Sequence, residues 1–163
     1  MGTKALLPRG VVLGVLLAAT VPAVAWAEAV AVRDPQFGAI VSAYQRGFPG
    51  LTEDMALRAA TGQEHRIRLL EELQARDAAG FGGSWYEPLT GAQHINAVGA
   101  GAAARAKELG DAGGVAVETH QVAFSLTQLQ AVAADINTGG HPVLGRAAID
   151  AAVPDPVANK VTV

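Results

Sequence analysis

The chain contains no cysteine, and this absence excludes several structures at once. It forms no disulfides, no thiolate zinc site and no thiol nucleophile. A basic balance is also missing, because 12 Lys and Arg stand against 15 Asp and Glu. An acidic chain without a basic run is poorly suited to nucleic acid or to anionic membrane surfaces. We therefore expect neither as a partner.

Aromatic residues are scarce at 5% of the chain, and much of its apolar content is alanine. Hydrophobic stabilisation scales at roughly 25 cal/mol per Å² of buried apolar surface, and alanine buries little of it. The 19 glycines add conformational entropy to the unfolded chain. We expect one domain that is only marginally stable on its own.

A long hydrophobic run is missing too, because the apolar stretch near the N-terminus falls short of the about 20 residues that span a bilayer. This stretch follows two basic residues, Lys4 and Arg9, and ends near small residues at Ala25 and Ala27. A positive segment, an apolar segment and a small-residue exit predict a cleavable signal peptide over residues 1–27 and a secreted protein. The alternative is a retained anchor helix. The remaining 10 basic and 15 acidic residues give a net charge of −5.

After the signal peptide, residues 28–79 have helical patterns. Apolar residues at helix-face spacing predict a helix near residues 37–48. Thr52 is typical of an N-cap. Thr61, followed three residues later by Glu64, predicts a capping box at the start of a further helix.

The glycine-rich residues 80–83 predict a linker or turn, where we place the boundary to an α+β region at residues 80–163. The overall prediction is an α+β fold with N-terminal helices and a small, largely antiparallel sheet carrying two helices. Its expected elements are a hairpin (84–87 and 92–98), a helix (99–110), a half-buried strand (115–120), a helix capped by Ser125, and a second hairpin (147–153 and 160–163).

The serines do not indicate a hydrolase. Ser84 lacks the glycine two residues later that a nucleophile elbow requires. Ser125 is explained as an N-cap, and Ser42 falls inside the first predicted helix. We predict no catalytic residue on this chain.

The four histidines show no metal-binding pattern. None of His65, His94, His120 and His141 lies within five residues of another, and none has metalloprotease spacing. Ordinary surface or hydrogen-bonded histidines are favoured over a site assembled from distant ones. We therefore predict neither a metal nor a cofactor.

Two segments carry a family resemblance. Residues 82–91, Gly-Gly-Ser-Trp-Tyr-Glu-Pro-Leu-Thr-Gly, resemble a recurring segment in the propeptides of secreted bacterial chymotrypsin-like serine proteases of the streptogrisin and alpha-lytic type. Residues 155–163 resemble the last hairpin of such propeptides, where Asn and a basic residue lead into a valine-rich strand. The intervening alanine-rich helix, histidine-containing strand and serine-capped helix are similar as well, so the resemblance covers roughly residues 37–163.

The resemblance implies a folding assistant and inhibitor of a chymotrypsin-like serine protease domain, acting in cis or in trans, and no catalytic activity. Physically, such contact is expected through sheet extension, in which an exposed strand edge pairs with a partner strand. The candidate edge here is formed by Lys160, Val161, Thr162 and Val163.

The sequence departs from a full protease precursor, because it has neither a histidine-containing protease block nor a Gly-Asp-Ser-Gly-Gly loop. It is therefore expected to be either the front of a longer precursor, which its ending within a strand-like run slightly favours, or a stand-alone propeptide-like protein. An alternative from another class is a secreted binding protein without a protease partner. A third is an enzyme with a polar site near His94, His120 or His141.

Overall fold

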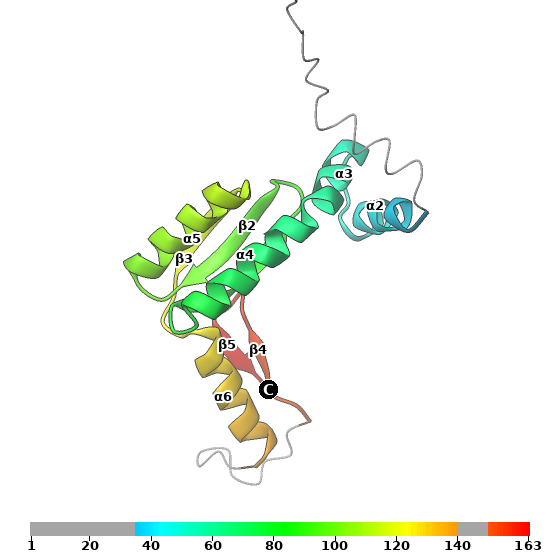
Figure 1. Cartoon of the computed structure of the whole chain (residues 1–163). Helices are drawn as coiled ribbons and strands as arrows, with labels where there is room; N and C mark the ends of the chain where they lie inside the picture. Colours follow the sequence, from blue (N-terminus) through cyan, green and yellow to red (C-terminus); the bar gives the residue numbers. More distant parts are fainter. Residues whose placement is uncertain (1–34, 140–149) are drawn as a thin grey trace, which may run out of the picture.

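A computed structural model of the chain describes residues 35–139 and 150–163 (Figure 1). Within these ranges, no helix has the length and apolar character needed to cross a bilayer. Outside the described residues lie the predicted signal peptide 1–27 with Ala25 and Ala27, His141, and residues 147–149 of the predicted strand 147–153.

The described residues form helices and strands of an α+β protein, which confirms the predicted class. The elements, in chain order, are α2 (Pro35–Gly47), α3 (Glu53–Thr61), α4 (Gln63–Arg76), β1 (Phe81–Glu87), β2 (Ala92–Ala97), α5 (Ala100–Gly113), β3 (Val117–Gln121), α6 (Leu126–Asn137), β4 (Val153–Asp155) and β5 (Lys160–Thr162).

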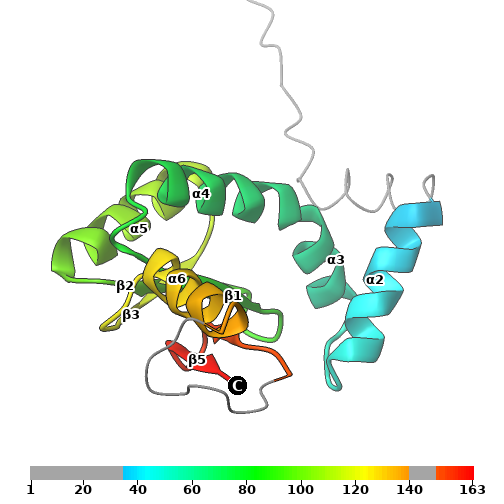
Figure 2. The same ribbon diagram turned by 90° about the horizontal axis from the view of Figure 1, so that it is seen from below.

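The strands are arranged differently from the prediction. They form two sheets, one of three strands in the order β1-β2-β3 and one of two strands, β4-β5. β1 and β2 form an antiparallel hairpin, but β2 and β3 are parallel. The parallel pairing follows from α5, which carries the chain back along the sheet before β3 begins. In the view of Figure 2, helices α4 and α5 lie above the sheet, the β4-β5 hairpin lies below it, and α6 is drawn in front of β1.

The main core is shared by the helices and the three-stranded sheet. Ile95 at its centre is 1% exposed. The other buried members are Leu69 and Leu73 of α4, Phe81 of β1, Ala106 of α5, and Val115. The core therefore continues from α4 across the boundary that the glycine pattern suggested at residue 80.

Most of the glycine-rich segment is strand, which corrects the predicted linker or turn, and only Gly80 lies in a turn. Phe81 to Gly83 begin β1 and are buried. The register between β1 and β2 shifts between Phe81 and Gly83, and Gly83 has a φ of 105°. This backbone conformation favours glycine. A Cβ atom there would also lie 2.6 Å from Cβ of Pro156, so the glycine allows close approach of the β4-β5 hairpin.

Helix boundaries are set by local side-chain bonds, and one prediction about them is wrong. Thr52 caps α3 as predicted, with its hydroxyl accepting from the Met55 amide at 3.3 Å. Thr61 does not begin a helix. It ends α3, and its hydroxyl donates to the Leu57 carbonyl at 3.0 Å, while Gly62 precedes α4 without a side-chain cap.

The predicted cap of α6 is confirmed. The Ser125 hydroxyl accepts from the Gln128 amide at 3.3 Å, and the Gln128 side chain accepts from the Ser125 amide at 2.9 Å. This reciprocal capping box fixes the start of α6.

Candidate functional site

The candidate edge predicted from the sequence lies in the β4-β5 hairpin. Lys160, Val161 and Thr162 form β5, and Val163 follows it. Pro154 of β4 lies opposite Val161. Because proline has no N–H, Pro154 and Val161 cannot exchange the two bonds of a hydrogen-bonded pair. They therefore take the non-hydrogen-bonded place in the ladder, and the ladder bonds belong to the neighbouring pairs. The N–H and C=O of Val161 therefore point away from β4, to an edge that no other described strand occupies.

The opposite edge of the same hairpin is different in character. Pro154 occupies the middle of β4. Its outward position lacks a donor, and prolines in edge strands discourage pairing with further strands. Of the two edges of this hairpin, β5 is therefore the one suited to accept a partner strand.

Asn159 fixes the turn that leads into β5. Its φ of 49° is positive, a conformation that asparagine tolerates better than most residues. Its side chain accepts from the Phe124 amide at 3.0 Å and donates to the Phe124 carbonyl at 2.8 Å. The asparagine in the family-like segment therefore has a structural role, because it joins the hairpin turn to the segment before α6.

Two further asparagines hold the hairpin. Asn137, at the end of α6, donates to the Ala152 carbonyl at 2.9 Å and accepts from the Ala152 amide at 2.7 Å. Asn96 of β2 is 1% exposed and donates to the Pro156 carbonyl. The apolar contribution is smaller, because the cluster beneath the hairpin is formed by Ala133, Ile136 and Ala152, with Val161 packed against it. Polar contacts therefore determine much of the hairpin's position.

Exposed apolar side chains accompany the hairpin. Val153 is 55% exposed, Val157 61% and Val163 65%. The side chain of Phe124, whose backbone amide donates to the Asn159 side chain, is 51% exposed. Apolar residues gathered beside an open strand edge are typical of an interaction surface.

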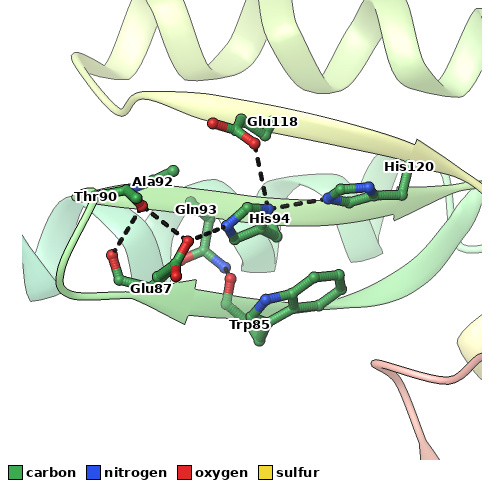
Figure 3. Close-up of polar contacts among 8 residues, drawn as sticks. All are labelled: Trp85, Glu87, Thr90, Ala92, Gln93, His94, Glu118 and His120. Atoms are coloured by element: carbon green, nitrogen blue, oxygen red, sulfur yellow. Dashed lines mark hydrogen bonds and ion pairs between the residues drawn. The ribbon is translucent and has the colours of Figure 1, made fainter. Parts of the chain in front are cut away.

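A second feature lies on the three-stranded sheet, where the structure brings together polar side chains of three strands (Figure 3). Nδ1 of His94 lies 2.9 Å from Nε2 of His120 and 3.6 Å from a carboxylate oxygen of Glu118. Nε2 of His94 lies 3.3 Å from a carboxylate oxygen of Glu87. The Trp85 ring stacks on both imidazoles, with centroids 4.9 Å from His94 and 5.1 Å from His120. We call these five residues the histidine cluster.

Two of the histidines singled out in the sequence therefore meet, although 26 positions separate them. The parallel register places His94 opposite Glu118 and Asn96 opposite His120. His65 lies elsewhere, with Nδ1 3.2 Å from the Gly113 carbonyl. The roles of Trp85, Glu87 and Glu118 were missed. A usable signal was their alternate spacing within strands, since such residues share one face of a sheet.

On the other face of the sheet, a groove of about 700 Å³ lies beside Arg66 and Tyr86. Arg66 is 8% exposed, and its guanidinium carbon lies 3.7 Å from the centroid of the Tyr86 ring. Burial raises the pKa of the Tyr86 phenol above its ordinary value of 10.0, and the positive charge of Arg66 opposes part of that rise.

This shift predicts a loss of stability at alkaline pH. The pKa of the Tyr86 phenol is higher in the folded chain than in the unfolded chain. The contribution of this phenol to the free energy of unfolding is therefore complete below the unfolded-state pKa, and it is lost as the pH rises through the folded-state pKa. Denaturant unfolding between about pH 9 and about pH 11 should show a smaller pH-dependent decline for Tyr86→Phe than for the natural chain. Identical declines would contradict the role given to this phenol.

No family model, curated protein or solved structure matches this chain.

Proposed function

We propose that this chain is a secreted, propeptide-like folding assistant and inhibitor of a chymotrypsin-like serine protease, and that it contacts the protease through β5. The observation that carries the proposal is the outward-facing backbone of Val161 at one edge of the hairpin, while Pro154 blocks the opposite edge. The resemblance of residues 82–91 and 155–163 to propeptides of such proteases supports the choice of partner.

The edge of the three-stranded sheet at β3 is less suited to this role. Two residues of β3 have exposed side chains, the charged Glu118 and the polar His120. Charged side chains on an edge strand are a common protection against pairing with other chains, and β5 carries only one such residue, Lys160, at its first position.

The exposed Val163 directly follows β5, and the exposed Val153 and Val157 lie in β4 and in the turn of the same hairpin. Burial of such side chains against a partner is favourable. Sheet extension at β5 supplies main-chain hydrogen bonds, and these valines supply apolar contacts.

The test is a calorimetric titration that measures how tightly the chain binds a streptogrisin-type or alpha-lytic-type protease. The active site of the protease is blocked so that the chain is not cleaved. Val161→Pro removes the outward N–H and leaves the ladder bonds of its neighbours in place. We expect it to weaken binding at least about tenfold, because one lost hydrogen bond is worth about 1 kcal/mol and the ring disturbs strand contact.

Thr162→Ala is the matched control, because it changes an exposed side chain of the same strand and keeps the backbone donors. It should bind like the natural chain. Circular dichroism confirms that each variant is folded. Absence of binding by the natural chain, or equal binding by Val161→Pro, would overturn the proposed contact.

A further inference from the structure

We propose that His94, Glu118 and His120 bind one zinc ion on the face of the three-stranded sheet. This inference does not rest on the proposed function, because it concerns other residues and a different ligand. It starts from the histidine cluster of Figure 3, where two imidazoles and one carboxylate converge from two neighbouring strands.

The distances suit a zinc ion. Zinc bonds nitrogen at about 2.0–2.1 Å and carboxylate oxygen at about 2.0–2.2 Å, which places tetrahedral ligand atoms roughly 3.3 Å apart. Nδ1 of His94 lies 2.9 Å from Nε2 of His120 and 3.6 Å from Glu118, on either side of that value. All three ligand atoms lie within 4.8 Å of one another. Small side-chain adjustments therefore suffice to close the site.

The second ring nitrogen of His94, Nε2, faces a carboxylate, as in many metal-binding histidines. A histidine that binds metal typically donates its other N–H to a carboxylate, which fixes the tautomer and the ring orientation. Nε2 of His94 lies 3.3 Å from the Glu87 carboxylate, which only accepts hydrogen bonds when ionised. The Nδ1 lone pair therefore points toward His120 and Glu118. The Thr90 hydroxyl donates to the same Glu87 oxygen at 3.0 Å and orients the carboxylate.

The surroundings combine a rigid inner ligand with an accessible side. The His94 side chain is 10% exposed, and its ring is nearly parallel to that of Trp85, at 7°. The Glu118 side chain is 60% exposed, which gives an ion a path from solvent. With the His94 hydrogen on Nε2 toward Glu87, the contact between His94 Nδ1 and His120 Nε2 assigns the donated hydrogen to His120 in the metal-free chain. Zinc would replace that hydrogen bond, with the hydrogen of neutral His120 carried on Nδ1.

The donor set indicates the class of cation. Imidazole suits zinc and other late first-row metals, whereas calcium takes six to eight oxygen ligands and magnesium prefers oxygen and water. Two imidazoles and one carboxylate leave a fourth position of tetrahedral zinc for water. Calcium is therefore the discriminating control ion.

The test is calorimetric titration of the full chain with zinc chloride and, separately, calcium chloride. We expect one zinc ion per chain and no calcium binding. His120→Ala removes an exposed ligand, and we expect at least about 100-fold weaker binding. Glu87→Gln changes only the group behind His94, and we expect about 10–100-fold weaker binding. Thermal melts should show zinc raising the Tm of the natural chain but not that of His120→Ala.

His65→Ala is the matched control, because it removes an exposed histidine away from the cluster. It should bind zinc like the natural chain. The melts without metal establish that each variant is folded. No zinc binding by the natural chain, or equal binding by folded His120→Ala, would overturn the site.

Discussion

Arg66→Ala is expected to lower the free energy of unfolding by about 3 kcal/mol, because it removes several interactions of a buried cation. Nη2 of Arg66 donates to the Ala59 carbonyl at 2.7 Å and to the Tyr44 hydroxyl at 3.5 Å. The guanidinium also lies over the Tyr86 ring. One side chain of α4 thus joins the N-terminal helices to β1, and its removal leaves a buried carbonyl without that donor.

Urea unfolding followed by circular dichroism measures this loss. Arg68→Ala is the matched control, since Arg68 lies in the same helix and its pair with Glu64, at 2.9 Å, is largely exposed. Exposed pairs of this kind are worth at most about 0.5 kcal/mol. Similar losses in the two variants would refute the role assigned to Arg66.

Asn159→Ala is likewise expected to cost about 3 kcal/mol of unfolding free energy. Two hydrogen bonds to the Phe124 backbone are lost, at about 1 kcal/mol each. The positive φ of 49° then adds about 1 kcal/mol of strain for alanine. The same urea experiment measures the change, and hydrogen exchange should show the loss of protection concentrated in β4 and β5.

Asn159→Gly separates the two causes. Glycine adopts the positive φ without strain but offers no side-chain hydrogen bond, so we expect a loss of about 2 kcal/mol. If Asn159→Ala were as stable as the natural chain, the turn would not depend on this asparagine.

Several elements of the fold could be predicted because their signals are local. Thr52 and Ser125 each cap the helix that follows, and both caps are observed. One local signal failed, because Thr61 ends α3 and does not cap α4.

Elsewhere the prediction failed where distant contacts matter. Gly82 and Gly83 were interpreted as a linker or turn, but they lie in the buried start of β1, where Val122 and Pro156 approach them closely.

The candidate sites, too, could be predicted only as far as their signals are local along the chain. The open edge at Val161 followed from a strand-like run, although only the pairing with Pro154 shows which backbone groups face outward. The histidine cluster could not be predicted from spacing along the chain. His94 meets His120 only because α5 returns the chain in parallel register, and metal motifs with short spacing do not describe such a site.

We propose above all that this chain binds a chymotrypsin-like serine protease through β5 and inhibits it. The most direct test of this proposal is the rate of peptide hydrolysis by an active streptogrisin-type or alpha-lytic-type protease, titrated with the chain. We predict that hydrolysis stops near an equimolar amount of the natural chain, and that Val161→Pro requires a higher concentration than Thr162→Ala. Unchanged hydrolysis in a micromolar excess of the folded chain would contradict the proposal.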